Sequence, residues 1–372
     1  MKQEPFAVEQ YMDKYETSIT HNMGETCVES LRLNEVLTAD EMSTLMQKQL
    51  TYGAIHGSDE LTSQIAQLYS NLDQKQVVVA NGAIGANFLG FYSIINPGMK
   101  VVVVTPTYQQ LVSVPAMFGA TVSEYRLQFD HKWQPQLDAL EQAVAADTDV
   151  LVVNNPNNPT GVVWDDATME AVVAICRKHN VLLYSDEVYR PLYHSTTNPP
   201  KSAIDYGYDR VVVSGSMSKA FSLAGVRVGW LASRSPSIIE DLWLKRDYNT
   251  ISVSMVDDFI AAKALAHREE ILKRNYDICR KNLKTIGDII AKHHDLVEWV
   301  VPTGGSTCFL KVKADTARLG PELAEKYQTL VVPGETFGYP GFIRVGYGND
   351  PKAIEGGLQQ LAKVLSGVAS AQ

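Results

Sequence analysis

The sequence predicts an α/β protein built as two lobes. From about residue 75 to about residue 230, short apolar runs end in Gly, Asn, Pro or Ser turns and lead into helical segments, which is the order of β-α-β units. From about residue 294 the pattern changes to short apolar runs between Gly and Pro, which predicts a smaller α+β lobe with antiparallel strands. With 372 residues, 45% of them hydrophobic and 20% charged, the chain is long enough for a large core.

Charge and cysteine usage disfavour several function classes. The net charge is −9, from 33 basic and 42 acidic residues, and there is no run of Lys or Arg, so nucleic acid and anionic membranes are not expected partners. We find no signal-peptide pattern and no long apolar run, and therefore expect a cytoplasmic protein. The four cysteines are widely spaced and lack a C-x-x-C pair, which predicts neither a metal site nor a disulfide framework.

The first hundred residues begin with an N-terminal arm. Apolar residues between 5 and 15 have helical spacing, and their aromatic members suggest that the arm packs on another surface, plausibly a second subunit. A second amphipathic helix follows Ser58, a plausible N-cap, with Leu61, Ile65 and Leu68 on one face.

The next stretch predicts a strand, a glycine turn, a helix and a second strand. The strand Val77–Ala80 leads into a helix that opens with Gly82, Ala83 and Ile84, and the free N–H groups of such a terminus can bind phosphate, although many glycine turns serve geometry alone. Tyr108 follows the second strand, where an aromatic ring can stack on a flat heteroaromatic ring.

A proline-rich loop follows the third predicted strand. A helix is expected at Leu137–Ala146, a strand at Val150–Val153, then Asn-Pro-Asn-Asn-Pro-Thr-Gly and a helix at Thr168–His179. Because the prolines keep the backbone extended, the amide of Asn158 is held at the edge of the sheet, although such a loop can also merely cap the next helix.

Two further strands end in polar side chains. One ends in Asp186, with Tyr189 three residues later; an Asp-Glu pair is usually solvated, but this one follows a buried strand. The other begins at Val211 and delivers Lys219 in a loop of small and apolar residues. Partial desolvation would lower the pKa of that lysine and make its amine a nucleophile toward a carbonyl, whereas a lone loop lysine is usually solvated.

The Lys219 loop also offers an anion clamp. Arg227 follows the lysine by eight residues, and Ser216 and Ser218 could add hydroxyl donors. Farther on, a long amphipathic region from Met255 to His293 is expected to link the lobes, and Arg246 before it is interpreted as a surface charge.

The C-terminal part predicts a helix beginning near Pro321 and a strand that contains Arg344. A charge between apolar neighbours in such a strand needs a partner, because burying an unpaired guanidinium is costly.

Taken together, Ser-x-Ser-Lys with its arginine, the N-P-N-N-P-T-G loop and Asp186 resemble the pyridoxal-phosphate enzymes of fold type I, class I/II aminotransferase family, over roughly residues 45–350. The resemblance implies an aspartate aminotransferase-like fold with a mostly parallel, seven-stranded-type sheet. It places the large cofactor-binding domain at 48–284 and the small domain, with its N-terminal arm, at 1–47 and 285–372.

The same resemblance assigns the cofactor site. It implies that Lys219 carries pyridoxal 5'-phosphate as a Schiff base and acts as general acid and base, and that Asp186 keeps the pyridine nitrogen protonated. Tyr108 would lie over the ring, with Asn158 and Tyr189 on its phenolic oxygen. The implied phosphate ligands are Arg227, Ser216, Ser218, Gly82, Ala83 and Ile84.

The resemblance also implies the substrate and the assembly. Arg344, Asn158 and the turn at Gly24 would bind the α-carboxylate of an amino acid. The protein would be a homodimer in which Tyr52, spaced as Tyr-x-x-x-x-Gly before a helix, reaches the neighbouring site, and the region around Arg246 would also approach the neighbour.

Two reactions remain open at this point. Tyr189 and the complete N-P-N-N-P-T-G favour transamination to a 2-keto acid. The segments LKRDYNTISVS, VPTGGSTCF, VVPGETFG and FIRVGYG, together with the arm, resemble the capreomycidine synthase-like branch, which implies β/γ-elimination, replacement or cyclisation of a modified amino acid. The set of functional residues argues against a non-catalytic binding module, and the absence of G-x-G-x-x-G after a strand argues against a nicotinamide oxidoreductase.

Overall fold

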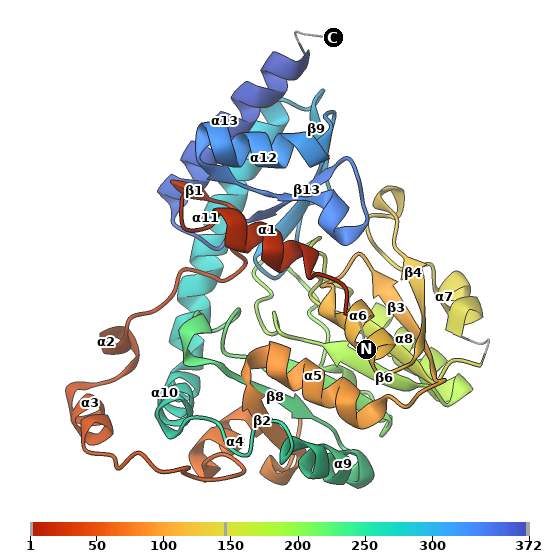
Figure 1. The fold of residues 1–372 in the computed structure, drawn as a ribbon, viewed down its shortest axis with the longest axis vertical. Helices are drawn as coiled ribbons and strands as arrows, with labels where there is room; N and C mark the ends of the chain where they lie inside the picture. The colour runs from red at the N-terminus through yellow and green to blue at the C-terminus, as the bar shows by residue number, and fades with distance from the viewer. Residues whose placement is uncertain (1–2, 145–146, 370–372) are drawn as a thin grey trace.

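The computed structural model describes residues 3–144 and 147–369. Its large lobe is built on a seven-stranded sheet in the order β2-β8-β7-β6-β5-β3-β4 (Figure 1). The pairs from β7 to β4 are parallel, and β8 runs antiparallel to both β2 and β7. The strands are β2 Val77–Asn81, β3 Lys100–Thr105, β4 Thr121–Arg126, β5 Val150–Asn154, β6 Leu182–Asp186, β7 Val211–Ser216 and β8 Val228–Ala232.

Both faces of this sheet are buried. Val101 and Val103 of β3 belong to one hydrophobic core, while Val102 and Val104 belong to the other, because successive side chains of a strand point to opposite faces. The helices of this lobe are α4 Asp59–Ala66, α5 Gly82–Ile94, α6 Gln110–Met117, α7 Leu137–Val144, α8 Asp166–His179, α9 Pro236–Arg246 and α10 Met255–Ala266. Because helices cover both faces of the parallel strands, polar side chains gather at the carboxyl ends of these strands.

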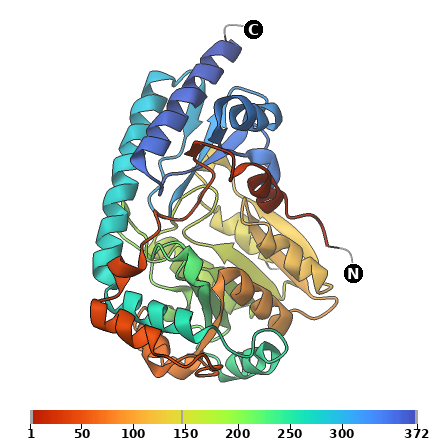
Figure 2. The same ribbon diagram turned by 60° about the vertical axis from the view of Figure 1, so that its left-hand side comes forward.

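The small lobe has a four-stranded antiparallel sheet in the order β12-β13-β10-β9 and a short parallel pair of β1 with β11. Its strands are β1 His21–Asn22, β9 Val297–Trp299, β10 Thr307–Val312, β11 Thr329–Leu330, β12 Val332–Pro333 and β13 Phe342–Gly346. Its helices are α12 Thr316–Tyr327 and α13 Pro351–Ala369, and α11 Arg268–Lys292 runs along both lobes (Figures 1 and 2). Short 3-10 turns lie at Gln74–Gln76, Phe129–His131, Ala203–Asp205, Ala224–Val226 and Gly334–Phe337.

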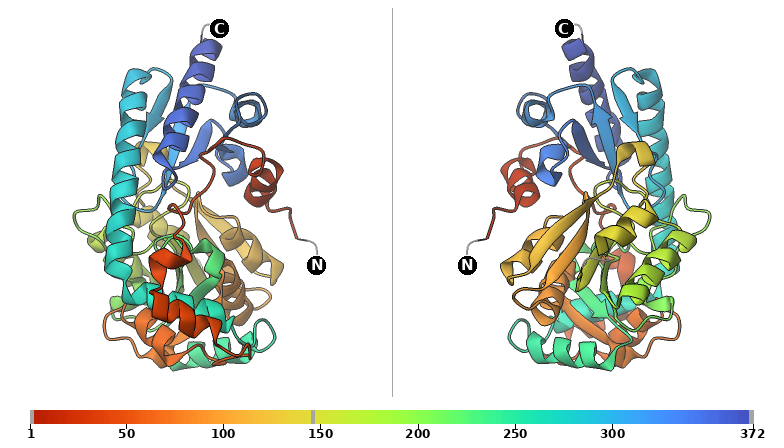
Figure 3. Two further views of the ribbon diagram at one scale, coloured as in Figure 1. Left: turned by 90° about the vertical axis from the view of Figure 1, so that its left-hand side faces the viewer. Right: turned by 90° about the vertical axis from the view of Figure 1, so that its right-hand side faces the viewer.

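The N-terminal arm packs on its own chain. Helix α1, Ala7–Tyr15, lies beside the small lobe and above the large sheet (Figure 3), and its residues Val8, Met12 and Tyr15 are buried there. Phe6 packs against Tyr108 with ring centroids 4.8 Å apart. The apolar stripe of the arm therefore needs no second subunit to cover it. Two short helices follow, α2 Leu33–Val36 and α3 Ala39–Met46.

The predicted α/β architecture is confirmed, and two expected helix boundaries change. The region from Met255 to His293 divides at His267 into α10 and α11. Helix α12 begins at Thr316 rather than near Pro321, because Asp315 already accepts the first backbone hydrogen bonds. The helix expected at Leu137–Ala146 is seen to Val144, and its last two residues lie outside the described part of the chain.

Arg246 is not a surface charge. Its side chain is buried, and its Nε donates to the carbonyl of Val79 at 2.8 Å, while Nη1 donates to the carbonyl of Ile251. The guanidinium thus joins the end of α9 to β2 within one chain.

None of the described helices is long and apolar enough to cross a membrane.

Candidate active site

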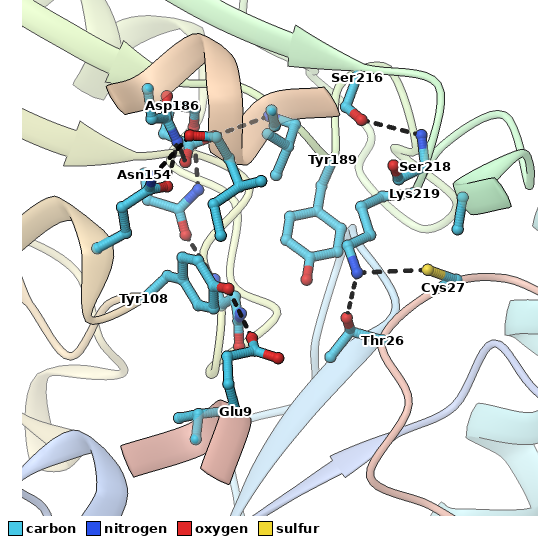
Figure 4. A pocket seen from close by; sticks show the side chains of 18 of the residues that line it. Glu9, Thr26, Cys27, Tyr108, Asn154, Asp186, Tyr189, Ser216, Ser218 and Lys219 are labelled. Carbon is cyan, nitrogen blue, oxygen red and sulfur yellow. Dashed lines mark hydrogen bonds between the residues drawn. The ribbon is translucent and has the colours of Figure 1, made fainter. Parts of the chain in front are cut away.

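A cavity of about 340 Å³ opens where the carboxyl ends of β5, β6 and β7 face α1 and the small lobe (Figure 4). It brings together nearly all of the residues predicted from the sequence. The predicted residues that line it are Gly24, Ala83, Ile84, Tyr108, Asn158, Asp186, Tyr189, Ser216, Ser218, Lys219, Arg227 and Arg344.

Lys219 follows β7 and faces the segment between β1 and α2. Its Nζ donates to Thr26 Oγ1 at 2.5 Å, lies 3.3 Å from Cys27 Sγ and is 4.0 Å from Glu25 Oε1. Burial lowers the pKa of Lys219, but Cys27, Tyr189 and Glu25 outweigh it and raise the pKa above its ordinary value. The low pKa expected for Lys219 is therefore wrong for this arrangement, because Cys27, Tyr189 and Glu25, which come from other segments of the chain, favour the charged amine.

Asp186 ends β6 at the floor of the cavity and is 3% exposed. It accepts hydrogen bonds from Asn87 Nδ2 at 3.0 Å and from the backbone N–H of Val188 at 3.1 Å. Burial raises the pKa of Asp186 to about 6, against these hydrogen bonds, which lower it. The carboxylate is thus held in one orientation and still mostly ionised at neutral pH.

An anion clamp is assembled from three segments. Helix α5 begins at Gly82, where an added Cβ would lie 2.5 Å from Arg227 Nη2. Arg227 Nη1 donates to the carbonyl of Ala224 at 2.7 Å and lies 3.5 Å from Ser218 Oγ. A guanidinium, a serine hydroxyl and the N-terminus of a helix therefore converge, which is the chemistry that binds phosphate.

Arg344 crosses from the small lobe into the same cavity. It is 2% exposed, its Nη2 donates to the carbonyl of Gly24 at 2.8 Å, and its Nη1 donates to Asn158 Oδ1 at 3.3 Å. Its Nε has no hydrogen-bond partner, and it forms no ion pair with any residue that the structure describes. The sequence analysis predicted that Arg344 needs a partner, and its partners are thus the amide of Asn158 and the carbonyl of Gly24. Both are uncharged, so the positive charge of Arg344 remains available for an anion.

Two tyrosines complete the walls. The buried Tyr189 Oη has no hydrogen-bond partner among the described residues, and burial chiefly raises the pKa of this phenol. Tyr108 donates its phenolic hydrogen to Glu9 Oε1 at 2.6 Å (Figure 4).

Two predicted residues stand apart from the lining. Gly82 lies immediately behind Arg227, as described above. Tyr52 is 70% exposed on the loop before α4 and does not line the cavity.

The cavity also contains residues that sequence reasoning missed. They are Val8, Glu9, Met12, Glu16, Thr26, Cys27, Asn87, Gln110, Asn154, Val188 and Ala224. Of these, Thr26 and Cys27 lie two and three residues beyond Gly24, the turn that the resemblance places at the substrate, whereas no pattern in the sequence marked the others.

The residues present fit pyridoxal 5'-phosphate. The cavity offers a lysine amine for a carbonyl, an anion clamp at a helix N-terminus and a buried carboxylate for a cationic ring nitrogen. The buried Tyr189 Oη lines the same cavity and can donate a hydrogen bond to an oxygen of the bound group.

Comparison with known proteins agrees with this chemistry. The family model for aminotransferase class I and II matches residues 21–361. An aspartate aminotransferase of Thermotoga maritima is 28% identical over 341 residues, 89% of this chain and 88% of the relative. The capreomycidine synthase of Streptomyces vinaceus is 28% identical over 332 residues, 89% and 84% of the two chains.

Solved structures extend the similarity to the whole fold. A PLP-dependent aminotransferase from Streptococcus suis superimposes with a TM-score of 0.93 at 33% identity and covers 98% of both chains. The PLP-dependent cyclase OrfR shares the fold, with a TM-score of 0.90 at 24% identity over 99% of this chain and 98% of its own. The chain therefore belongs to the class I and II aminotransferase family and is a pyridoxal 5'-phosphate-dependent enzyme.

Proposed function

We propose that this enzyme is an aminotransferase that converts an α-amino acid to its 2-keto acid, with Lys219 as the lysine that holds the cofactor. One observation carries the proposal: the amine of Lys219, the carboxylate of Asp186 and the guanidinium of Arg344 line a single cavity.

Each of the cofactor's polar groups has a partner in this proposal. When bound, pyridoxal 5'-phosphate supplies an electron-accepting ring that allows the Cα–H bond of an amino acid to break. Asp186 would hold the ring nitrogen protonated, and Tyr108 would stack on the ring. The phenolic oxygen would be bound by Tyr189 and Asn158, and the phosphate by Arg227, Ser216, Ser218 and the backbone of Gly82, Ala83 and Ile84.

The remaining polar groups would hold the substrate. Arg344 and Asn158 would bind the α-carboxylate, beside the backbone turn at Gly24, and a fixed carboxylate orients the Cα–H bond. Lys219 Nζ would accept the proton from Cα and later donate it to another atom of the substrate–cofactor pair. Glu25 Oε1 lies 4.0 Å from Nζ and would stabilise the protonated amine after it has accepted the proton and before it donates it.

We also propose that the enzyme is a homodimer in which Tyr52 completes the neighbour's phosphate site. Leu50 and Tyr52 on one loop, and Tyr248 and Ile251 on another, are exposed. The first loop meets the start of α10, which follows the second loop, because an added Cβ at Gly53 would lie 2.9 Å from Met255 Cβ. Apolar side chains gathered in this way favour a protein partner.

The second candidate is a PLP-dependent elimination, replacement or cyclisation enzyme. The similarity to capreomycidine synthase favours it, because the identity of 28% and the 89% of this chain that is covered are the same as for the aspartate aminotransferase. Breaking a bond at Cβ or Cγ would require the same Lys219 and Asp186, so the cavity supports both reactions.

One experiment separates the two. The cofactor-loaded protein is mixed with a panel of amino acids without a keto acid, while the absorbance spectrum and product masses are followed. An aminotransferase yields one equivalent of keto acid per site and stops with the amino form of the cofactor. Sustained turnover with loss of a leaving group identifies the second candidate, and Lys219→Ala should remove either activity.

A further inference from the structure

A chain of four polar side chains joins the floor of the cavity to the core between α5, α6 and β6. Tyr184 Oη donates to Asn87 Oδ1 at 2.9 Å, and Asn87 Nδ2 donates to Asp186 Oδ2 at 3.0 Å. Asn87 Nδ2 also donates to Gln110 Oε1 at 3.4 Å, and Gln110 Nε2 donates to the carbonyl of Ile84 at 2.7 Å. Each of the four side chains is at most 4% exposed. The chain is therefore a buried network that ends at the carboxylate of the site.

The surroundings of this network are apolar. Ala86, Leu89 and Phe91 of α5 and Leu111 of α6 belong to the same hydrophobic core as Tyr184. The ring of Phe91 stacks on that of Tyr184, with centroids 4.4 Å apart. Polar groups in such a layer are costly unless each one is hydrogen-bonded, and apolar side chains would fill the same space at no such cost. We therefore expect the network to serve the site in which it ends.

Helix α5 leaves room for the phenol of Tyr184. Gly90 lies three residues after Asn87 on this helix, and an added Cβ there would lie 2.6 Å from Tyr184 Oη. A larger residue at this position would push the phenol away from Asn87. Burial, and then the charge of Asp186, raise the pKa of Tyr184, so the phenol keeps the hydrogen that it donates to Asn87.

The network fixes the direction in which the Asn87 amide faces. An amide has an oxygen that accepts and an NH2 group that donates two hydrogen bonds. The oxygen accepts from Tyr184, and the two hydrogens of the NH2 group have two acceptors, Asp186 and Gln110. The amide thus presents a donor to the carboxyl group of Asp186. A donor at this place stabilises the ionised carboxylate relative to the protonated acid.

Asp186 depends on such donors because it is buried. Burial raises the pKa of its carboxyl group to about 6, whereas the backbone N–H of Val188 and the amide of Asn87 lower it, and so does the charge of Lys219. The N–H of Val188 belongs to the backbone, and Lys219 is assigned to the cofactor's carbonyl. Asn87 is therefore a side chain whose substitution tests the charge of Asp186 without removing a group that reacts.

We propose that Asn87 is a positioning residue of this enzyme, whose amide, held by Tyr184 and Gln110, keeps the Asp186 carboxylate ionised and turned toward the cofactor's ring nitrogen. The proposal rests on the proposed function, in which Asp186 binds that nitrogen. One proton lies between the carboxyl group and the nitrogen. A hydrogen bond that stabilises the carboxylate favours the arrangement with this proton on the nitrogen, which makes the ring the better electron acceptor.

The first test measures the carboxyl group in the cofactor-free protein. The chemical shift of the Asp186 carboxyl carbon, in protein labelled with ¹³C-aspartate, is followed against pH, and Asp186→Asn identifies the signal. Asn87→Leu removes the amide and keeps a side chain of similar size. We expect the affinity of Asp186 for a proton to rise roughly tenfold or more in Asn87→Leu, because hydrogen bonds to charged groups are among the strong ones.

Ser93→Ala is the matched control for Asn87→Leu. Ser93 is a buried polar residue of the same helix, lies outside the cavity, and its hydroxyl has no partner among the described residues. Its removal should leave the proton affinity of Asp186 within about twofold, since it changes no group that touches the carboxyl.

The second test follows the cofactor in the loaded enzyme. The ¹⁵N chemical shift of pyridoxal phosphate labelled at its ring nitrogen distinguishes a protonated nitrogen from a neutral one at neutral pH. Asn87→Leu should move this shift toward the neutral form. Its kcat should fall about tenfold while KM changes less than about threefold, because Asn87 contacts neither the α-carboxylate ligands nor the reacting amine.

Tyr184→Phe tests the network with Asn87 in place, and it decides the matter if Asn87→Leu does not fold. It removes the phenolic hydroxyl alone, so the Asn87 amide loses the bond that directs its oxygen away from Asp186. The proton affinity of Asp186 should rise by roughly threefold or more. In the double variant, Tyr184→Phe should add nothing to Asn87→Leu, because both substitutions act through one amide.

The outcomes separate the inference from the proposed function. An unchanged titration of Asp186 in Asn87→Leu and Tyr184→Phe, or additive effects in the double variant, would overturn the inference and leave the proposed function intact. A ring-nitrogen shift that Asp186→Asn does not alter would overturn the proposed role of Asp186, and the inference with it.

Discussion

Gly82 lies so close to Arg227 that a Cβ on the glycine would be 2.5 Å from Nη2 of the guanidinium. Gly82 also has a φ of +66°, which side-chain-bearing residues rarely adopt. The position therefore requires glycine for two reasons, and both concern the proposed phosphate clamp at the start of α5.

The first prediction follows from this contact. Gly82→Ala should displace Arg227 and weaken pyridoxal 5'-phosphate binding by roughly tenfold or more, since an Arg–phosphate contact is a strong, charge-assisted one. Absorbance titration of the cofactor-free protein measures the Kd.

Gly85→Ala is the matched control for Gly82→Ala. It lies one turn farther along α5, where an added Cβ would meet Asn81 at an ordinary 3.6 Å. Its cofactor Kd should stay within about twofold, and its helix should gain about 0.5–1 kcal/mol. Equal Kd values for the two variants would show that the contact with Arg227 has no part in binding.

The second prediction concerns the guanidinium of Arg344, which can donate two parallel hydrogen bonds. Arg344→Lys keeps a positive charge but cannot make two parallel hydrogen bonds to a carboxylate. We expect kcat/KM for the best amino acid to fall about 100-fold, with most of the loss in KM, because two charge-assisted hydrogen bonds are weakened.

An amine that lacks the α-carboxylate provides the comparison for Arg344→Lys. Its slow reaction with the cofactor should change by less than about threefold, since it makes no contact with the guanidinium. A similar loss for the amine and the amino acid would mean that the substitution disturbs the cavity rather than carboxylate binding.

The third prediction is a pH dependence of stability. Burial raises the pKa of Asp186 to about 6 from its ordinary value of 3.8. The folded cofactor-free protein therefore binds more protons than the unfolded chain between about pH 4 and 6, and its free energy of unfolding falls as the pH rises through that window. The difference corresponds to about 3 kcal/mol lost by pH 7.

Asp186→Asn removes the contribution of this carboxyl group to the pH dependence of the free energy of unfolding. The cofactor-free variant should lose less stability than the native protein between pH 4 and 7, by up to about 3 kcal/mol, while its catalytic activity is lost. Urea unfolding at several pH values measures this. Asp138→Asn, at an exposed position, is the control, and parallel pH profiles for native protein and Asp186→Asn would contradict the burial argument.

Local sequence sufficed for the floor of the site. Asp186 and Lys219 follow runs of apolar residues that form buried strands, and parallel strands bring their carboxyl ends to one edge of the sheet. The side chains at that edge could thus be placed together without knowledge of the rest of the fold.

The walls of the site depend on contacts that no local pattern encodes. The bonds from Lys219 to Thr26 and Cys27 span more than 190 residues, and the bond from Tyr108 to Glu9 spans 99. They form because the small lobe and α1 pack over the large sheet. Their effect on charge, including the raised pKa of Lys219, could not be read from the sequence.

Two other features show the limit of pattern reasoning. Arg246 belongs to a helix with charged neighbours, and nothing in the sequence indicates that the loop after α9 folds back to bury it. The division into domains at 48–284 stays a prediction; its second boundary falls within the continuous helix α11.

The last prediction tests whether Tyr52 acts on the neighbouring site. The residue is exposed and outside the cavity of its own chain, so removing its side chain should impair catalysis only if a second copy presents it. We expect Tyr52→Ala and Lys219→Ala each to have less than about a tenth of native activity, because each lacks one group that binds the cofactor or reacts with it.

Unfolding and refolding a mixture of the two variants gives heterodimers. Each heterodimer has one site with both native residues, its Lys219 from one chain and its Tyr52 from the other. That site should restore activity to about a quarter of the native level for a statistical mixture, with half of the dimers mixed and one of two sites complete in each. Light scattering should show a dimer throughout, and Val301→Ala, which removes an exposed apolar side chain of the small lobe, serves as the control and should keep native activity. If the mixture is no more active than the variants alone, Tyr52 does not complete a site in trans.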